Sequence, residues 1–557
     1  MQTHDVTNQV PPLVGHDTSA DPALQSAIDR EGAGWAREEI GELVRLACTA
    51  EAQEWGRLAE RTPPVLTTHD RYGHRIDEVE YTPTYHRLME TAVGHGLHGA
   101  PWADDRPGAH VARAAKFLAW NVDAGHGCPI SMTYAVVPAL RANPELASTY
   151  EPLLTSTTYD PGLRVPSTKQ GLIAGMSMTE KQGGSDVRAN TTQAQPESDG
   201  SYRLTGHKWF TSAPMSDLFL TLAQAPGGRR QRGGGADALG QSDLSCFLVP
   251  RVLPDGTRNP MHLMRLKDKL GNKSNASSEI EYDGAGAWLV GEEGRGVRTI
   301  VEMVNMTRLD CTLGTASGMR AAVVQATHHA RHRSAFGRAL IDQPLMRNVL
   351  ADLVVESEAA TTVAMRLAGA TDRAVRGDSD EASFRRLALA VSKYWVCKRG
   401  PAVAGEAMEC LGGNGYVEES GMPRIYRELP LLSIWEGSGN VAALDALRAI
   451  GREPESLDRF FTEVELAAGA DHRLDDAIAL VKKELSDIDE IELRARRLVE
   501  QLALVLQGSL LVQHAPPAVA DAFCATRLAR DWGGAFGTLP KGLDLQPILE
   551  RAFVDVG

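Results

Sequence analysis

The sequence has few cysteines and no long run of apolar residues. Its seven cysteines are odd in number and form no Cys-x-x-Cys pair, which argues against a disulfide framework and against a structural zinc site. No apolar stretch approaches the roughly 18 residues of a membrane-spanning helix. The segment from Met1 to Asp5 lacks a basic region followed by an apolar one, so we expect no signal peptide. These absences favour a protein of the reducing cytoplasm with no membrane partner.

The sequence also lacks an excess of positive charge, since its formal net charge is -14. Nucleic acid is attracted by positive charge, so this balance argues against attraction of the whole molecule to a polyanion. A local basic patch stays possible. The 557 residues, 43% hydrophobic and 23% charged, are typical of a globular protein with three or four domains.

The pattern of the sequence changes along the chain. Residues 1–171 are mainly helical in pattern, whereas residues 172–290 contain short apolar stretches separated by turn residues such as Asp283-Gly284, which predicts a β domain. Helical periodicity returns over residues 291–450 and continues in residues 451–557. We expect an α+β fold with an N-terminal helical domain, a central β domain, a C-terminal helical bundle and an extra C-terminal helical domain.

Several helices can be placed from their ends. Asp21 can cap a helix near the N-terminus. Long helices are predicted over residues 345–367 and 382–411, the second ended by Gly412 and Gly413.

One segment has low complexity. The stretch from Pro226 to Gly235 combines three arginines with six glycines or prolines. This composition predicts a disordered loop within the β domain, and a local contact with nucleic acid is the alternative.

Two segments of the β domain could hold a ligand. Gly183, Gly184 and Ser185 follow an apolar strand-like run, where glycines let backbone amides approach a phosphate or a flat ring; a plain turn is the alternative. They form no Gly-x-Gly-x-x-Gly motif and no helix is expected after them, so a Rossmann site is not expected. Trp209 and Phe210 end a second strand and either pack into the core or cover a flat ring.

The segment from Thr327 to Gly337 reads as a basic helix end. His328 and His332 are four residues apart and could share a metal ion. No carboxylate lies at a matching spacing, so we expect a cationic turn and no metal site.

Glu436 lies among small residues directly before an apolar helix that starts near Val441. Such a helix start is suited to an anion, and a carboxylate there could simply complement the helix dipole. Alternatively, Glu436 could act as a general base, because removal from water raises the pKa of a carboxyl group towards the operating range.

The segments containing these residues occur in one order along the chain. They are residues 178–186, 206–212, 333–337, 411–416 and 434–440. Together they resemble the flavin-binding and catalytic signatures of the acyl-CoA dehydrogenase family. Residues 181–184 and Trp435 differ from the usual forms and are similar to a branch of the family linked to the bacterial response to DNA alkylation.

The resemblance implies an oxidoreductase that binds FAD and oxidises an acyl-CoA thioester. Glu436 would remove the α-proton while the β-hydride passes to flavin N5. Thr179 would meet the pyrimidine edge of the flavin, Trp209 its face and Thr211 its N5. The residues expected at the cofactor are Met176, Met178, Thr179, Gly184, Ser185, Trp209, Phe210, Thr211, Ser212, Arg333, Phe336, Gly412, Gly413, Trp435, Gly437, Ser438 and Asn440.

The resemblance also implies an assembly. Arg333, Phe336 and the Gly412-Gly413 pair would reach the cofactor of a neighbouring subunit, so we expect a homo-oligomer, and a tetramer in particular. An electron-transfer flavoprotein or oxygen would then reoxidise the flavin.

One departure concerns the substrate. The family usually carries Asp-x-x-Arg on the helix that recognises CoA, whereas this chain has Asn305 and Arg308 at these positions. Trp435 beside the base would narrow the pocket. Short or branched acyl-CoA substrates and modest activity are therefore expected.

A different function class also fits the resemblance: a flavoprotein of the DNA alkylation response whose main role is DNA binding. Residues 451–557 contain 12 Lys and Arg against 19 Asp and Glu. A DNA-binding surface requires positive charge, so this acidic region could instead be a helical oligomerisation domain.

Overall fold

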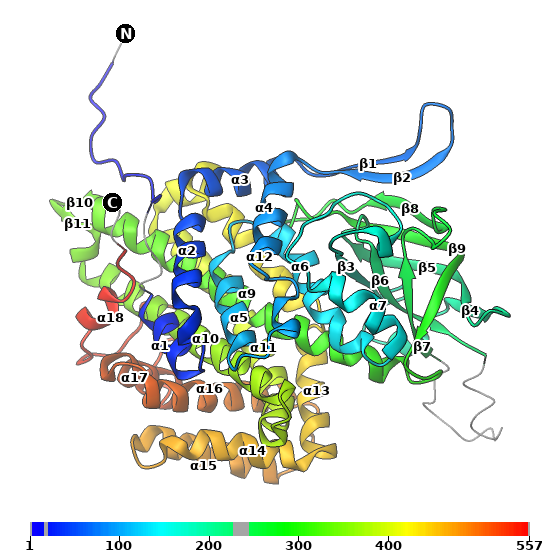
Figure 1. Ribbon diagram of the computed structural model, residues 1–557. Helices are drawn as coiled ribbons and strands as arrows, with labels where there is room; N and C mark the ends of the chain where they lie inside the picture. Colours follow the sequence, from blue (N-terminus) through cyan, green and yellow to red (C-terminus); the bar gives the residue numbers. More distant parts are fainter. Residues whose placement is uncertain (1–2, 16–20, 227–243, 555–557) are drawn as a thin grey trace. The chain divides into compact units, whose positions relative to one another are not determined.

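The computed structural model describes residues 3–15, 21–226 and 244–554 (Figure 1). The chain forms two compact units. The helical unit comprises residues 1–53, 106–121 and 308–557, and the sheet unit comprises residues 54–105 and 122–307. Apart from Pro226, the low-complexity segment predicted as a loop lies outside the described residues. No described helix is long and apolar enough to cross a membrane.

The sheet unit is built on seven strands, which confirms the predicted β domain. The strands run β3-β6-β4-β5-β9-β7, with β8 beside β9, and β6 also pairs with β7 so that five strands close a ring. Every residue of β7 is buried, as expected for a strand covered on both faces. The strands are β3 (Ala174–Ser177), β4 (Gln193–Pro196), β5 (Tyr202–Ser212), β6 (Leu218–Gln224), β7 (Leu244–Pro250), β8 (Met261–Leu266) and β9 (Ser277–Val290).

The N-terminal region contains a β-hairpin that the helical prediction for residues 1–171 missed. Strands β1 (Val65–His69) and β2 (Arg75–Glu80) pair antiparallel, and Arg75 donates a hydrogen bond to the Leu263 carbonyl of β8 at 3.0 Å. Alternating β-branched residues in β1 were the available signal. The helices of this region are α3 (Ala50–Arg61), α4 (Pro83–Gly94), η3 (Ala100–Ala103), α6 (Ala124–Leu140), α7 (Pro144–Leu154), η4 (Pro166–Thr168) and η5 (Val187–Ala189).

The helical unit packs around α10 (Pro344–Val375). Every residue of α10 from Leu350 to Asp372 is buried, which is typical of a helix surrounded by others. The other elements are α1 (Pro22–Arg30), η2 (Gly34–Ala36), α2 (Arg37–Ala47), α5 (Ala109–Ala119), α9 (Gly296–His332, whose first part belongs to the sheet unit), β10 (Ser334–Ala335), β11 (Arg338–Ala339), η6 (Leu340–Asp342), α11 (Ser379–Cys410), η7 (Gly412–Tyr416), η8 (Glu418–Ser420), α12 (Met422–Ile434), α13 (Gly439–Arg452), α14 (Pro454–Val464), η9 (Glu465–Ala467), α15 (His472–Ser486), α16 (Ala495–His514), α17 (Pro517–Phe523), η10 (Cys524–Leu528) and α18 (Gln546–Glu550).

The predicted helix ends are confirmed. Asp21 caps α1 by accepting from the Ala23 amide at 2.9 Å, α10 covers residues 345–367, and α11 ends just before Gly412. The basic segment contains the predicted helix end, because α9 ends at His332, and the turn that follows is a short hairpin. Phe336 and Gly337 both have positive φ, the backbone that a tight hairpin turn requires.

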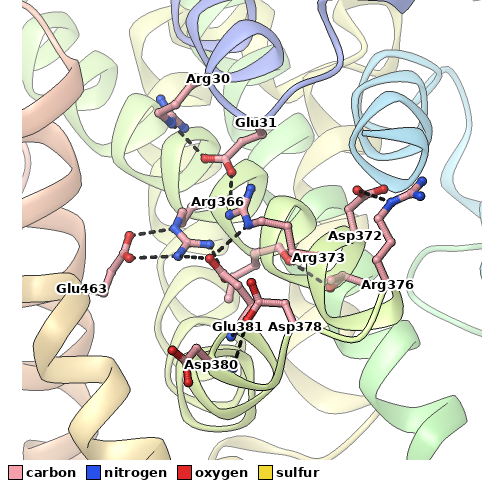
Figure 2. A network of polar contacts seen from close by, with 12 residues as sticks. Arg30, Glu31, Arg366, Asp372, Arg373, Arg376, Asp378, Asp380, Glu381 and Glu463 are labelled. Carbon is pink, nitrogen blue, oxygen red and sulfur yellow. Dashed lines mark hydrogen bonds and ion pairs between the residues drawn. The ribbon is translucent and has the colours of Figure 1, made fainter. Parts of the chain in front are cut away.

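Buried ion pairs join residues 451–557 to the rest of the helical unit. Arg366 of α10 bonds both Glu381 of α11 and Glu463 of α14, and Arg373 joins Glu381 to Glu31, the residue that caps the C-terminal end of α1 (Figure 2). Because these charges lie on three helices and at the end of a fourth, the extra C-terminal helices share one polar network with α1 and the bundle.

Candidate active site and flavin-contacting segments

Glu436 lies in a tight turn between α12 and α13. Its φ is +56°, a left-handed conformation that costs a non-glycine residue about 1–2 kcal/mol. Gly437 follows with a φ of +100°. Strained backbone of this kind persists only where surrounding contacts hold it, and it is concentrated at functional sites.

The contacts that hold this turn come from two cations on distant helices. The Glu436 carbonyl accepts from Nε of Arg308 of α9 at 3.0 Å. Lys393 of α11 donates through Nζ to the Trp435 carbonyl at 2.8 Å and to the Gly437 carbonyl at 2.5 Å. Three consecutive carbonyl oxygens are thus each bonded to a positively charged group, and hydrogen bonds to charged groups are stronger than neutral ones.

Arg308 is in turn fixed by Asp445 of α13. Its Nη1 lies 2.6 Å from Oδ2 of Asp445, which also pairs with Arg386 at 3.2 Å. Burial alone would raise the pKa of Asp445, but Arg308 and Arg386 outweigh it and lower that pKa. Asp445 therefore stays ionised at neutral pH and keeps the Arg308 side chain directed at the turn.

Polar groups around this turn are available for a ligand, which fits the FAD implied by the resemblance. Nε1 of Trp435 is buried and has no hydrogen-bond partner among the described residues. Ser438 precedes α13 without a side-chain cap on the helix, so the first amides of α13 can meet an anion. Asn440 is exposed and accepts from Nε of Arg496 of α16 at 2.8 Å.

In the sheet unit, Glu180 anchors the glycine-containing loop after β3. It is fully buried, and its carboxylate accepts from the amides and hydroxyls of Thr191 and Thr192 and from Nζ of Lys208 at 2.9 Å. Burial alone would raise the pKa of Glu180, but Lys208 and these hydrogen bonds hold it well below the usual range. The loop itself stays accessible, since Ser185 is exposed. A Cβ at Gly184 would lie 2.4 Å from the Thr179 hydroxyl, so only glycine fits there.

A β-bulge directs the aromatic pair of β5. Lys208 pairs with Ile280 and Thr211 with Ser278, so Trp209 and Phe210 together face a single residue of β9. The side chains of Lys208 and Thr211 are both buried, whereas Phe210 is half exposed and Trp209 is less exposed. The bulge therefore leaves the Phe210 side chain exposed instead of packed in the core.

The two segments of the sheet unit that are predicted to contact the flavin are bonded to each other. The Trp209 amide donates to the Thr179 carbonyl at 2.8 Å, and the Ser177 and Thr211 hydroxyls are 2.6 Å apart. Thr211 is fully buried in this arrangement, so its contact with flavin N5 stays a prediction. Met176 lies in β3, Met178 follows it, and Ser212 ends β5.

We expect Glu180→Gln to weaken retention of FAD by on the order of tenfold at pH 7, because a buried Lys208 loses its counter-charge and the loop loosens. The wild-type carboxylate has a folded-state pKa held well below 4.5, so its contribution to stability is complete above about pH 4.5 and is lost progressively at lower pH, where FAD is released as the folded state is lost. The variant should show a flatter profile there. Fluorescence of released FAD measures both, with exposed Glu197→Gln as the control; equal retention by wild type and Glu180→Gln would contradict the expectation.

The remaining predicted residues, Asn305 excepted, belong to the helical unit. Phe336 is 98% exposed at the tip of the β10–β11 hairpin, and Arg333 at its base is partly exposed and donates to the Asn8 carbonyl. Gly412 and Gly413 start η7, and a Cβ at either would meet open space. Asn305 lies in α9 one turn before Arg308. Roles of these residues in a neighbouring subunit's site stay predictions.

Lys393, Asp445 and Glu180 were assigned no role from the sequence. Lys393 had a signal, because it is a charged residue in an otherwise apolar stretch of α11 between Val391 and Val396. Asp445 and Glu180 offered no comparable pattern.

The paired histidines of α9 have other partners. His328 Nε2 lies 2.9 Å from the Pro11 carbonyl, and His332 Nδ1 lies 2.9 Å from the His328 carbonyl. Across residues 3–15, 21–226 and 244–554, no group of three or more His, Cys, Asp or Glu side chains could hold a metal ion.

Comparison with known proteins places the chain among flavoproteins. Residues 8–161 match the N-terminal domain of the adaptive response protein AidB, residues 175–285 the middle domain of acyl-CoA dehydrogenases, and residues 294–451 their C-terminal domain. The chain is 45% identical over 534 residues to AidB of Escherichia coli (strain K12), covering 95% of both chains.

Two comparisons with a nematode protein agree. The chain is 30% identical to acyl-CoA dehydrogenase family member 11 of Caenorhabditis elegans over 84% of this chain and 78% of that protein. The crystal structure of Caenorhabditis elegans ACDH-11 with C11-CoA has a TM-score of 0.82 and 28% identity, and the match covers 95% of this chain and 93% of that one. The predicted fold class and cofactor are thereby confirmed, and the chain belongs to the acyl-CoA dehydrogenase family of FAD-dependent oxidoreductases.

Proposed function

We propose that the protein oxidises an acyl-CoA thioester between its α- and β-carbons, with Glu436 as the base. The observation that carries this proposal is the Glu436 turn, in which a carboxylate is presented from a left-handed backbone held by two cations. A residue that only complemented a helix dipole would not need this bonding.

The residues of the chain divide the work as follows. Glu436 takes up the α-proton of the thioester, Arg308 and Lys393 fix its backbone, and Trp435 narrows the adjacent space. Bound FAD would supply the acceptor for the β-hydride, and the product would be a trans-2-enoyl thioester. In the sheet unit, the residues proposed to contact FAD are those of the loop after β3 and the end of β5. In the helical unit, they are those at the start of α13.

We propose a short or branched acyl chain for the substrate because Trp435 lies next to the base. Arg308 does not face solvent as a CoA-binding arginine would be expected to do, since it bonds Asp445 and the Glu436 carbonyl. Asn305 at the next turn also lacks the usual carboxylate, so modest affinity for CoA follows. ACDH-11, crystallised with C11-CoA, provides the contrasting longer chain.

Anaerobic bleaching of the flavin by a series of acyl-CoA thioesters tests this proposal. Isovaleryl-CoA should bleach the band near about 450 nm at least tenfold faster than an eleven-carbon acyl-CoA, because one or two methylenes in a filled pocket change binding by about 1–3 kcal/mol. Faster bleaching by the longer thioester would refute the chain-length assignment. If none of the thioesters bleached the flavin, the proposed dehydrogenase activity would be refuted.

DNA binding as the main role is the alternative, and the geometry favours catalysis over it. Arginines of the acidic region 451–557 are engaged with acidic side chains of the helical unit: Arg473 with Asp471 and Asp521, and Arg494 with Glu484. These two arginines already have acidic partners, which reduces their availability to phosphates. Binding of duplex DNA that weakens steeply with salt would support the alternative.

The assembly and electron acceptor also belong to the proposal. Exposed Phe336 and Tyr416 are apolar surface of the kind that association covers, which supports a homo-oligomer, with a tetramer as the expected state. We also propose that an electron-transfer flavoprotein reoxidises the flavin and that the protein is cytoplasmic. The division of the chain into four domains is part of the same proposal.

A further inference from the structure

Lys393 is a buried lysine with no acidic partner among the described residues. Its side chain is 1% exposed, and its ammonium group donates only to the carbonyl oxygens of Trp435 and Gly437. Other buried lysines of the protein have carboxylate partners: Lys169 pairs with Asp217 and Lys208 with Glu180. A buried cation is costly unless it is satisfied, so the position of Lys393 needs an explanation.

The two carbonyls that Lys393 bonds lie on either side of Glu436. The Glu436 carbonyl between them is bonded by Arg308, whose other partner is Asp445. The turn is therefore held from α11 by Lys393 and from α9 by Arg308. Only Lys393 contacts two peptide groups, one before and one after the left-handed residue, so it fixes the backbone on both sides of Glu436.

Buried cysteines lie close to Lys393 and Glu436. The carbonyl oxygen of buried Cys311 of α9 accepts a hydrogen bond from the Cys397 thiol at 3.5 Å. Burial raises the pKa of the Cys311 thiol well above its usual range, with opposing contributions from the Lys393 ammonium and the Glu436 carboxylate. The ammonium and the carboxylate thus both act on the Cys311 thiol, and the contacts of Lys393 with the turn are hydrogen bonds to its backbone carbonyls.

We infer that Lys393 is a positioning residue for the general base: it holds residues 435–437 in the conformation that presents Glu436. Its effect on catalysis rests on the proposed function, whereas its effect on the turn does not. A misplacement of about 1 Å at a reacting group can cost about a hundredfold in rate. Because residues 435–438 are also proposed to contact FAD, the FAD content of the variant is measured alongside its rate, and rates are compared per bound FAD.

The test compares Lys393→Met with wild type in the full-length holoenzyme. Hydrogen exchange measured by mass spectrometry should be at least tenfold faster in the peptide covering residues 434–440 of the variant. The limiting rate of flavin reduction by isovaleryl-CoA should fall about a hundredfold, with the substrate concentration at half-maximal rate changed less than about threefold. Lys116→Met is the matched control, because Lys116 is also buried in the helical unit but pairs with Glu39.

The outcomes separate this inference from the proposed function. Unchanged exchange at residues 434–440 in Lys393→Met would overturn it, as would the same local increase in Lys116→Met. If no thioester reduces the wild-type flavin, the proposed function fails while the exchange result still decides the role of Lys393. If Lys393→Met does not fold, Lys393→Gln replaces it, because the glutamine amide can still donate a hydrogen bond but carries no charge. Hydrogen exchange in the peptide covering residues 434–440 should again be faster than in wild type.

Discussion

Replacing Glu436 by Gln should reduce anaerobic bleaching of the flavin by isovaleryl-CoA about a thousandfold. The amide has nearly the same shape as the carboxylate but cannot take up a proton, and a positioned base contributes about 10²–10⁴-fold. The Glu436 turn is held through its main chain by Arg308 and Lys393, so the variant should keep its backbone and its FAD. Stopped-flow absorbance measures the reduction, and the oxidised spectrum checks the FAD content.

Two further variants make this test specific. Glu455→Gln removes an exposed carboxylate at the start of α14 and should leave the rate unchanged. Glu436→Asp retains a carboxylate on a shorter side chain and should be intermediate between wild type and Glu436→Gln. If Glu436→Gln retained more than a tenth of the wild-type rate with full FAD content, Glu436 could not be the base.

Replacing Arg527 by Met should destabilise the helical unit by about 3–5 kcal/mol, the usual cost of leaving buried charges without their partner. Arg527 is buried, and its Nη2 lies 2.5 Å from Asp352 and 2.8 Å from Glu356, both on α10. Burial alone would raise the pKa of Glu356, but Arg399 and Arg527 lower it to about 2. For Asp352 burial has the larger effect, and its pKa stays raised. Without Arg527, two carboxylates would share this site with Arg399 alone.

The apparent midpoint of urea unfolding measures this loss, since a chain of this size need not unfold in one step. The difference in stability between wild type and Arg527→Met should become smaller as the pH is lowered towards about 5. The buried carboxyl groups of the variant then take up protons in the folded state and lose their charge. Arg497→Met is the control, as Arg497 is 58% exposed and 3.9 Å from Glu484, where a pair contributes about 0–1 kcal/mol. Equal midpoints for Arg527→Met and the control would show that the buried pairs contribute little.

Elements with a repeating local signal were predictable from the sequence. The long helices α10 and α11 follow from apolar periodicity and a glycine stop, and the Asp21 cap follows from side-chain chemistry. The β1–β2 hairpin was missed because its short strands lie between helical stretches. The β10–β11 hairpin was missed because basic residues continue from the end of α9 through the turn, so that neither charge nor hydropathy marks the strands.

Features that depend on register were not predictable. The bulge in β5 places Lys208 and Thr211 on the same side of the strand although they are three residues apart. Alternation along an undisturbed strand would have put them on opposite faces. Because a bulge inserts one residue without a sequence marker here, only the pairing with β9 revealed which side chains are displayed.

The sequence by itself determined the family, the FAD cofactor and Glu436 as the candidate base, because these follow from short segments whose residue types and order are sufficient for recognition. The tertiary structure decided what holds that base. Arg308 lies 128 residues from Glu436 in the chain and Lys393 lies 44 residues from Gly437, and neither spacing corresponds to a local pattern. Hydrogen bonds and ion pairs act over a few ångströms, so partners this far apart in sequence are identified only when packing of α9, α11 and α13 brings them together.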